Sequence, residues 1–328
     1  MSAPLRLVFL GSDPIALPLL DWLAGEGREV ATVVGVFTQP DRATGRGQKV
    51  AANEIKVWAA ARGLPVHQPE KITEPVRLAL AELRPDVSLV MAYGHILRDD
   101  FIATPRLGSL NLHTSLLPKY RGASPIQTAV AGGDRETGVT LMRIVRQLDA
   151  GPVADVERVA IGAEDTALDL DRRLGEACVP LLRRALPRLR DGTLIFTPQD
   201  EAAATFCRRL EKGDGALDFR VAARALAARI NGLFPWPACT VTIQGVEVKF
   251  GLAVASTGQG QPGEVVESDS SELRIATGEG ILAVRRLQRP GGRMLAAAEF
   301  LRGFPIPTGT VIASREMTPL VGERPFRR

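Results

Sequence analysis

The sequence predicts an α/β fold with a Rossmann-like, mainly parallel sheet, followed by a smaller, OB-like β-barrel domain. Short apolar runs alternate with helical patterns up to about residue 190, whereas short strands separated by polar turns dominate beyond residue 238. With 328 residues, 45% of them hydrophobic, the chain is long enough to form two cores. We therefore expect a first domain at 1–190, a linker at 191–207 and a second domain at 208–328.

The first strand and helix establish the pattern of the first domain. Residues 5–10 form an apolar run that ends at Gly11, and Ser12-Asp13-Pro14 then supplies the cap and the proline typical of a first helical turn. Further strands are expected at 30–37, 87–93, 109–114 and 138–145, and helices at 53–62, 73–83, 125–131 and 166–189. Strands that alternate with helices imply right-handed crossovers and a mainly parallel sheet, whose sites lie at the carboxyl ends of its strands.

The second domain has a different pattern, with one short helix and several short strands. The helix is expected at 221–230 and is rich in arginine. Strands are expected within 239–250 around a Gln244-Gly245 turn, and at 264–267, 272–277 and 281–287. Small barrels of the oligonucleotide-binding type use such strands and loops to hold nucleic acid.

Positive charge is concentrated in this second domain. The formal net charge is +4, and residues 208–328 carry 17 Lys and Arg against 12 Asp and Glu, whereas residues 1–207 carry 24 against 25. A basic region beside a nearly neutral one favours a polyanionic partner. On charge alone, a solvated basic surface explains the surplus equally well.

The cysteines and the apolar runs limit the location of the protein. Cys178, Cys207 and Cys239 show neither C-x-x-C spacing nor a metal-ligand pattern with histidine, so we interpret them as reduced core or surface residues. No apolar run approaches the roughly 20 residues that cross a bilayer, and the N-terminus lacks a signal-peptide pattern. We therefore expect a cytoplasmic protein that has no membrane contact.

The run SLNLHTSLLPKYRG, residues 109–122, carries the clearest chemical signature. Asn111 and His113 lie two apart in an alternating strand pattern, so their side chains leave the same face of the sheet. A carboxamide N–H stabilises an oxyanion, an imidazole carries a proton, and Asp149 in the later Leu-Asp-Ala-Gly motif is suited to fix the charge state of the imidazole. We expect these three residues to converge in one small pocket suited to acyl transfer.

These two motifs together resemble the active-site signature of the folate-dependent formyltransferases, which use 10-formyltetrahydrofolate. Residues 37–42 (FTQPDR) and 45–49 (GRGQK) resemble the basic loop of the members that act on tRNA. Residues 92–97 (AYGHIL) resemble their folate-site loop, and residues 234–237 (FPWP), followed by a barrel, resemble their C-terminal domain. The resemblance covers nearly the whole chain and implies a catalytic role for the first domain and tRNA binding for the second.

The resemblance implies a transferase that moves the formyl group of 10-formyltetrahydrofolate to the α-amine of methionine on initiator tRNA, for translation initiation. It implies that Asn111, His113 and Asp149 are catalytic. No metal is expected, because the formyl amide is already activated and the sequence shows no cluster of metal ligands. We also expect a monomer. The donor is expected to contact Met91, Ala92, Tyr93, Gly94, Ile96, Leu97, Ser115, Leu116, Leu117, Pro118, Gln147 and Leu148. The tRNA is expected to contact Arg42, Arg46, Lys49, Arg285, Arg286, Arg289 and Arg293.

Several alternative functions agree less well with the sequence. The G-x-G-x-x-G fingerprint is missing after Gly11, which argues against binding of NAD. The nearest alternatives share the chemistry: an N-formyltransferase acting on an amino sugar nucleotide, or one acting on a small amine in purine synthesis. The basic second domain favours tRNA over both. An RNA-binding protein without activity is disfavoured because the catalytic trio is intact. His95 is expected to face solvent on its loop, and His67 to be structural.

Overall fold

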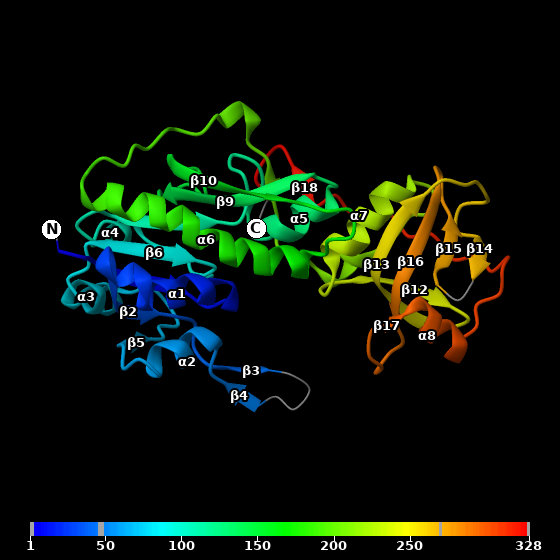
Figure 1. Ribbon diagram of the computed structural model, residues 1–328, viewed down its shortest axis with the longest axis horizontal. Coiled ribbons are helices and arrows are strands. Elements are labelled where there is room, and N and C mark those ends of the chain that lie inside the picture. Colours follow the sequence, from blue (N-terminus) through cyan, green and yellow to red (C-terminus); the bar gives the residue numbers. More distant parts are fainter. Residues whose placement is uncertain (1–2, 45–48, 269–270, 327–328) are drawn as a thin grey trace. The chain divides into compact units, whose positions relative to one another are not determined.

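The computed structural model describes residues 3–44, 49–268 and 271–326 (Figure 1). The chain divides into two compact units, which are described separately. The first comprises Met1–Arg121, Gly138–Val159 and Arg172–Ala204, and the second comprises Gly122–Thr137, Ala160–Asp171 and Thr205–Arg328. The segments Gly122–Thr137 and Ala160–Asp171 therefore interrupt the first unit in the sequence but belong to the second.

A seven-stranded sheet organises the first unit, with the strand order β10-β9-β7-β6-β1-β2-β5. The pairs β1–β2, β1–β6, β2–β5 and β6–β7 are parallel, whereas β7 and β9 are antiparallel. The mainly parallel sheet predicted from the sequence is therefore confirmed. Its strands are β1 (Leu5–Gly11), β2 (Ala31–Phe37), β5 (Val66–His67), β6 (Val87–Met91), β7 (Ser109–His113), β9 (Glu136–Arg143) and β10 (Val153–Ala160).

The helices begin at residues that the sequence pattern marks. Asn53 caps α2 (Glu54–Ala60), because its side-chain oxygen accepts from the Lys56 main-chain N–H at 3.0 Å. Asp13 caps the short 3-10 turn Pro14–Ala16 in the same way. The other helices of this part of the chain are α1 (Leu17–Ala24), α3 (Glu74–Glu82), α4 (Asp99–Ile102), α5 (Pro125–Ala131) and α6 (Ala167–Arg190).

Several strands of this region were not apparent from the sequence pattern, among them β3 (Arg42–Thr44), β4 (Lys49–Ala51), β5 and β10. β10 is an edge strand with half-exposed residues, so it lacks the apolar run that marks a buried strand. β3 and β4 form a two-stranded antiparallel hairpin where a loop is expected. Charged residues and glycine dominate that stretch, which hides the strands from a hydrophobic pattern.

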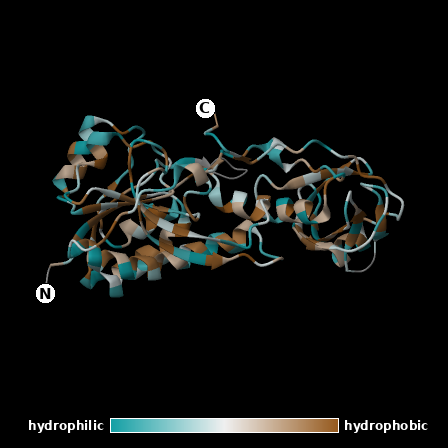
Figure 2. Ribbon diagram, turned by 90° about the horizontal axis from the view of Figure 1, so that it is seen from above, coloured by the Kyte–Doolittle hydropathy of each residue, from teal (hydrophilic) through white to brown (hydrophobic). Residues whose placement is uncertain are grey.

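The core of the first unit lies against its central strands. One cluster joins side chains of β1, β2 and β6 to Leu80 of α3 and Phe101 of α4, all of them buried. In Figure 2, the central strands are coloured as mostly hydrophobic, whereas the surrounding helices carry both kinds of residue. Helix α6 packs on this sheet, since the Cys178 sulfur lies 3.9 Å from that of Met91 at the end of β6. The sheet is thus a rigid base for the loops at its strand ends.

The second unit is built on a curled antiparallel sheet with the path β12-β13-β16-β15-β14, and β17 pairs with β16. Helix α7 (Ala223–Leu233) packs against this sheet and against α5, where Gly232 allows close approach because a Cβ there would lie 2.3 Å from the Ala131 nitrogen. The expected small antiparallel barrel is confirmed as a half-barrel. Its strands are β12 (Cys239–Ile243), β13 (Val246–Ser256), β14 (Val265–Ser268), β15 (Leu273–Ala276), β16 (Ile281–Gln288) and β17 (Leu295–Ala296), followed by α8 (Ala297–Gly303).

A small three-stranded sheet completes the structure, with the order β18-β11-β8. These strands are β8 (Arg121–Gly122), β11 (Phe206–Cys207) and β18 (Val321–Gly322). No helix in the described part of the chain is both long enough and apolar enough to span a membrane.

Candidate active site

The carboxyl ends of four parallel strands meet at one edge of the sheet. β1 ends at Gly11, β2 at Phe37, β6 at Met91 and β7 at His113. In sheets of this kind the crevice outside these ends is where ligands bind. The loops that follow these strands therefore define the region in which the predicted catalytic residues must be examined.

His113 lies at the end of β7 and is only 6% exposed. Its Nε2 is 2.9 Å from the main-chain oxygen of Tyr120, which is an acceptor only, so Nε2 carries a proton and donates it. The other ring nitrogen, Nδ1, lies 3.8 Å from the Oδ2 of Asp149. The ring is thus oriented on one side by a carbonyl and faces a carboxylate on the other.

Asn111 lies two residues before His113 on β7, and its side chain leaves the same face of the sheet. It is half-buried, and its main chain is paired with Val90 of β6 and Met142 of β9. A strand paired on both sides is one of the most rigid positions in a fold. Asn111 is therefore a well-ordered candidate to donate an N–H to an oxyanion.

Asp149 reaches His113 by an unexpected route. Because β9 is antiparallel to β7, its last residue, Arg143, pairs with Leu110 at the amino-terminal part of β7. The loop after β9 must therefore turn back to bring the Asp149 carboxylate to within 3.8 Å of His113. The rule that sites lie at the carboxyl ends of parallel strands explains the place of His113 but not that of Asp149.

Three residues in the loops after β6, β7 and β9 have left-handed backbones, although none is glycine. Their φ angles are +48° at Ala92, +60° at Tyr120 and +50° at Asp149. Such a conformation costs a non-glycine residue on the order of 1–3 kcal/mol and persists only where its surroundings hold it. At Tyr120 it accompanies the carbonyl that orients His113.

The loop expected to contact the folate follows β6. Its turn is tied to two neighbouring loops, because the Ser12 main-chain N–H donates to the Ala92 oxygen at 3.2 Å and the Gln39 Nε2 donates to the Tyr93 oxygen at 3.0 Å. Gly94 has a φ of +81°, which favours glycine. Ile96, further along this loop, is 66% exposed, and Leu148 in the loop after β9 is 58% exposed.

The other residues expected to contact the donor differ in their exposure. Met91 and Tyr93 are buried in the core, and burial raises the pKa of the Tyr93 hydroxyl. Ser115 is also fully buried, and its hydroxyl donates to the Lys119 oxygen at 2.6 Å. The half-exposed or exposed residues of this set are Ala92, Gly94, Leu97, Leu116, Leu117, Pro118 and Gln147.

The remaining histidines and the cysteines have structural environments. His67 stacks on Phe37 with ring centroids 4.5 Å apart, and burial lowers its pKa. His95 packs edge-to-face on Tyr93 at 4.9 Å and is half-buried rather than facing solvent, and burial lowers its pKa as well. All three cysteines are free and buried. Burial raises the pKa of Cys178 to about 12, so this thiol is unreactive.

The basic stretch after β2 is only partly described. Arg42 opens β3, is exposed, and donates from Nη2 to the Gln39 Oε1 at 3.1 Å. Gln39 therefore contacts both the Arg42 side chain and the Tyr93 carbonyl of the loop after β6. Lys49 begins β4, and Arg46 lies outside the described residues.

The four arginines of the second unit that are expected to bind tRNA differ in their surroundings. Arg285 lies at an irregularity of β16, because Leu252 of β13 pairs with Arg286 and the next residue, Ala253, pairs with Val284. Arg285 is paired with the carboxylates of Glu164 and Glu272, and Arg293 with that of Glu299 at 3.0 Å. Arg289 lies over the ring of Phe304 at 5.9 Å. Arg286 is exposed.

A further basic residue, which the sequence did not single out, shares a face with Arg286. Lys249 of β13 pairs with Gln288 of β16, and Gln288 and Arg286 are two apart on the same strand. Residues directly opposite each other and residues two apart lie on one face of a sheet. Lys249 and Arg286 are therefore diagonal neighbours on one face of the half-barrel sheet.

Comparison with known proteins relates this arrangement to a family. Residues 5–186 match the family described as formyl transferase, and residues 209–305 match the formyl transferase C-terminal domain. The chain belongs to the formyl transferase family. The resemblance inferred from the motifs around His113 and Asp149 is thereby confirmed.

Relatives of this family are similar along nearly the whole chain. The methionyl-tRNA formyltransferase of Ectopseudomonas mendocina (strain ymp) is 42% identical over 300 residues, which cover 91% of this chain and 95% of the relative. The methionyl-tRNA formyltransferase of Sorangium cellulosum (strain So ce56) is 41% identical over 313 residues, 94% of this chain and 99% of the relative.

Solved structures share the fold of this family at low sequence identity. An N-formyltransferase from Helicobacter canadensis, in complex with folinic acid and dTDP-3-aminofucose, aligns with a TM-score of 0.63 at 19% identity over 87% of this chain and 99% of that one. HypX from Aquifex aeolicus, in complex with tetrahydrofolic acid, aligns with a TM-score of 0.62 at 18% identity over 96% of this chain and 51% of that one. These likenesses show the fold alone.

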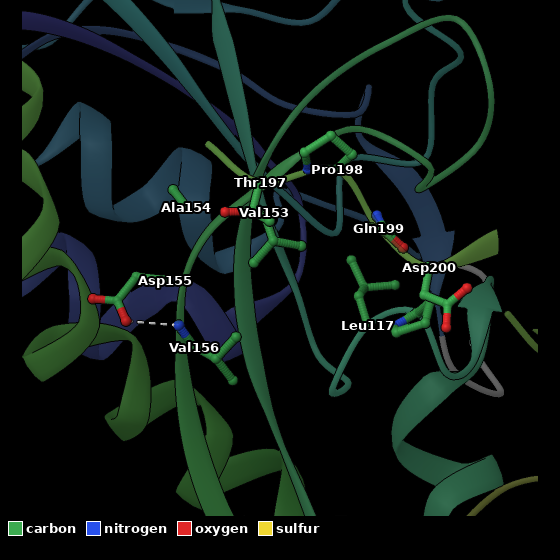
Figure 3. A pocket seen from close by; sticks show the side chains of 10 residues that line it. Leu117, Val153, Ala154, Asp155, Val156, Thr197, Pro198, Gln199 and Asp200 are labelled. Atoms are coloured by element: carbon green, nitrogen blue, oxygen red, sulfur yellow. Dashed lines mark hydrogen bonds between the residues drawn. The ribbon is translucent and has the colours of Figure 1, made fainter. Parts of the chain in front are cut away.

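A depression of about 480 Å³ lies beside the loop that follows β7, in the first unit of this formyl transferase (Figure 3). It is lined by Leu117, Pro118 and residues 153–156 and 197–200. Figure 3 shows Thr197 next to Val153 of β10, and Gln199 further along the same segment. From the sequence, this segment is expected to be a linker. Gln199 is not recognisable there as a site residue, since a single glutamine between Pro198 and Asp200 forms no pattern.

Proposed function

We propose that this chain transfers the formyl group of 10-formyltetrahydrofolate to the α-amino group of methionine esterified to initiator tRNA. The observation that carries the chemistry is the His113 ring, whose Nε2 is bonded to the Tyr120 carbonyl and whose Nδ1 faces Asp149 at 3.8 Å. The similarity to methionyl-tRNA formyltransferases over more than nine-tenths of the chain supports the acceptor.

In this reaction the amine attacks the formyl carbon, and a new N–C bond forms as the bond from that carbon to N10 of the folate breaks. Asn111 donates its side-chain N–H to the oxygen that becomes negative. Because Tyr120 keeps Nε2 protonated, Nδ1 of His113 is the ring nitrogen that accepts and returns the proton. Asp149 stabilises the ring while it is charged, and the amine's proton ends on N10 of the leaving folate.

The donor site is proposed at the loops after β6 and after β9. Ile96 and Leu148 offer exposed apolar surface, which suits a flat ring system. The main chain at Gly94 can approach the ring edge because glycine has no side chain of its own. Met91, Tyr93 and Ser115 support these loops from the core rather than through exposed side chains.

For the tRNA we propose two surfaces. Arg42 and the rest of the basic stretch, including Arg46 and Lys49, serve the acceptor end near the chemistry. Lys49 and Arg46 are assigned from the sequence alone. On the half-barrel, Arg286 together with Lys249 supplies phosphate contacts, since Arg285 and Arg293 are already paired with carboxylates. Arg289, which directly follows the last residue of β16, is included in this surface on the basis of the sequence.

We further propose that residues 1–190 act as the catalytic domain, 191–207 as the connection and 208–328 as the tRNA-binding domain. The two family matches, at 5–186 and 209–305, support this division. We also propose that the protein acts as a monomer in the cytoplasm, where tRNA is charged and used.

The function is tested by offering two acceptors to one donor. Purified protein is incubated with 10-formyltetrahydrofolate labelled in the formyl group, and with either Met-tRNA or a dTDP-linked amino sugar. We expect label in Met-tRNA and none in the sugar nucleotide. Label in the sugar nucleotide alone would contradict the proposal and assign the chain to sugar formylation.

A further inference from the structure

A connected set of hydrogen bonds links Arg121 to the loop that carries Asp149, and Gln199 lies at its centre. The Gln199 Nε2 donates to the main-chain oxygens of Asp149 at 2.8 Å and of Gly151 at 2.7 Å. Its Oε1 accepts from the Arg121 Nε at 3.1 Å and Nη2 at 2.9 Å. Both donors and both lone pairs of the amide are thus used, which determines its orientation.

Arg121 is a firm anchor for this amide. Its side chain is only 2% exposed, and its guanidinium also forms a two-bond pair with the Glu201 carboxylate, at 2.9 and 2.7 Å. Paired contacts of this kind define direction as well as distance. Hydrogen bonds from Arg121 hold the pKa of Glu201 below its usual range, so the pair is charged at neutral pH.

The segment that carries Gln199 is itself held on the sheet. Thr197 and the first residue of β10, Val153, exchange two main-chain hydrogen bonds of 2.8 Å each. Asp200 caps the short turn that follows, by accepting from the Ala202 N–H at 3.0 Å. Gln199 therefore projects from a backbone with defined position (Figure 3).

The loop that receives these bonds needs support. Asp149 has a φ of +50°, which a non-glycine residue keeps only where its surroundings hold it. Gly151 is packed so closely on the end of β9 that a Cβ would lie 1.8 Å from the Arg143 oxygen. The Gln199 amide donates to the main-chain carbonyls of these two constrained residues, which flank Ala150.

We propose that Gln199 and Arg121 are positioning residues that hold the Asp149 carboxylate opposite His113. Two consecutive residues then orient both partners of the pair, since the Tyr120 carbonyl orients His113 and Arg121 acts on Asp149 through Gln199. A displacement of about 1 Å in a reacting group costs on the order of 100-fold in rate. This inference rests on the proposed function for its kinetic readout.

The test compares single-turnover formylation of Met-tRNA by the parent and by Gln199→Met, which keeps the volume and removes the amide. We expect the rate to fall about 10- to 100-fold, with both substrate KM values within about threefold of the parent. Gln244→Met is the matched control, because the Gln244 amide also donates to a carbonyl, that of Pro305, but in the second unit. A Gln199→Met rate within threefold of the parent would overturn the proposal.

A double-mutant cycle with Asp149→Ala separates positioning from general support of the fold. If Gln199 acts through Asp149, Gln199→Met has no further effect in the Asp149→Ala background. Losses that multiply would overturn the proposal. Gln199→Glu serves where the Met variant does not fold, because it keeps an acceptor for Arg121 and removes both donors. The same loss of rate is expected.

Hydrogen exchange gives a readout that does not depend on activity. In Gln199→Met the main-chain amides of residues 147–151 should exchange at least tenfold faster, while those of β7 are unchanged. Unchanged exchange in residues 147–151 would overturn the positioning role of Gln199, even if the parent formylates Met-tRNA. Should the parent protein formylate no acceptor, faster exchange in Gln199→Met than in the parent would support the positioning role of Gln199 and contradict only the proposed function.

Discussion

The Nδ1 of His113 lies 3.8 Å from the Oδ2 of Asp149, although the two residues approach from opposite ends of an antiparallel strand pair. The distance is longer than a direct hydrogen bond, and it leaves room for a small movement when the ring becomes charged. Because the other ring nitrogen is committed to Tyr120, all proton exchange must use the side that faces Asp149.

Gly94→Val should weaken binding of the folate. The glycine has a φ of +81°, and a Cβ there meets only the Gln39 Nε2 at 3.5 Å, so a side chain would point into open space beside the loop. We expect the Kd for tetrahydrofolate, measured by calorimetry, to rise at least tenfold. Gly63→Val is the control, because Gly63 has a φ of +64° in the same unit with nothing within 4 Å. Equal Kd values for the two variants would exclude this loop from the donor site.

Arg42→Ala should impair use of the tRNA and leave the donor site intact. Arg42 is exposed, opens the basic hairpin and is joined through Gln39 to the loop after β6. We expect kcat/KM for initiator Met-tRNA to fall at least tenfold, with the KM for the folate within twofold. Arg28→Ala removes an exposed charge from the same unit and should change neither value. Equal losses in Arg28→Ala and Arg42→Ala would show that only net charge matters.

Replacing Arg286 and Lys249 by alanine should weaken binding of all tRNAs alike. Phosphate contacts release counterions, so each lost contact lowers the slope of log K against log salt by about 0.7–0.9. Titration of initiator and elongator tRNA over a range of salt measures this slope. Arg293→Ala is the comparison. The Arg293 guanidinium is already paired with Glu299, so its removal should lower the slope less. A larger effect at Arg293 would place the tRNA elsewhere on the half-barrel.

Asp214 should support the second unit only above acidic pH. Burial acts to raise the pKa of Asp214, but hydrogen bonds from Arg208 and the Glu211 N–H outweigh it, so its pKa lies below the usual 3.8. A carboxyl whose pKa is lower in the folded state contributes stability above the unfolded value, and this contribution is lost as pH falls through the folded value.

Asp214→Asn should therefore lower the free energy of unfolding by about 3 kcal/mol at pH 7, since it breaks a largely buried ion pair. The difference from the parent should shrink below about pH 3.8. Urea unfolding at pH 7 and pH 3 measures both values. Asp191→Asn, in an exposed pair with Arg190, should cost less than about 1 kcal/mol at either pH. A loss for Asp214→Asn that does not change with pH would refute the role of its charge.

The sequence predicted the sheet well where its strands are buried, because apolar runs such as residues 5–10 and 87–91 leave a clear pattern. It did not reveal β10, whose edge position leaves its residues half-exposed, or the charged hairpin that begins at Arg42. Those elements are determined by main-chain pairing with a neighbouring strand, which a single strand's pattern does not encode.

The candidate site shows the same division. The spacing of Asn111 and His113 follows from strand periodicity, so the sequence predicts their shared face. The direction of β9, the Tyr120 carbonyl and the bonds of Gln199 depend on tertiary structure. The pairing of arginines such as Arg285 with distant glutamates likewise appears only once the chain is folded.

The central claim is that the side chain of His113 carries the proton of formyl transfer. Its most direct test is the single-turnover rate of formylation of Met-tRNA by His113→Ala, with both substrates saturating so that binding does not limit the rate. We predict a loss of at least about 100-fold, since general acid–base catalysis typically contributes 100- to 10,000-fold. A rate within a few-fold of the parent would contradict the mechanism.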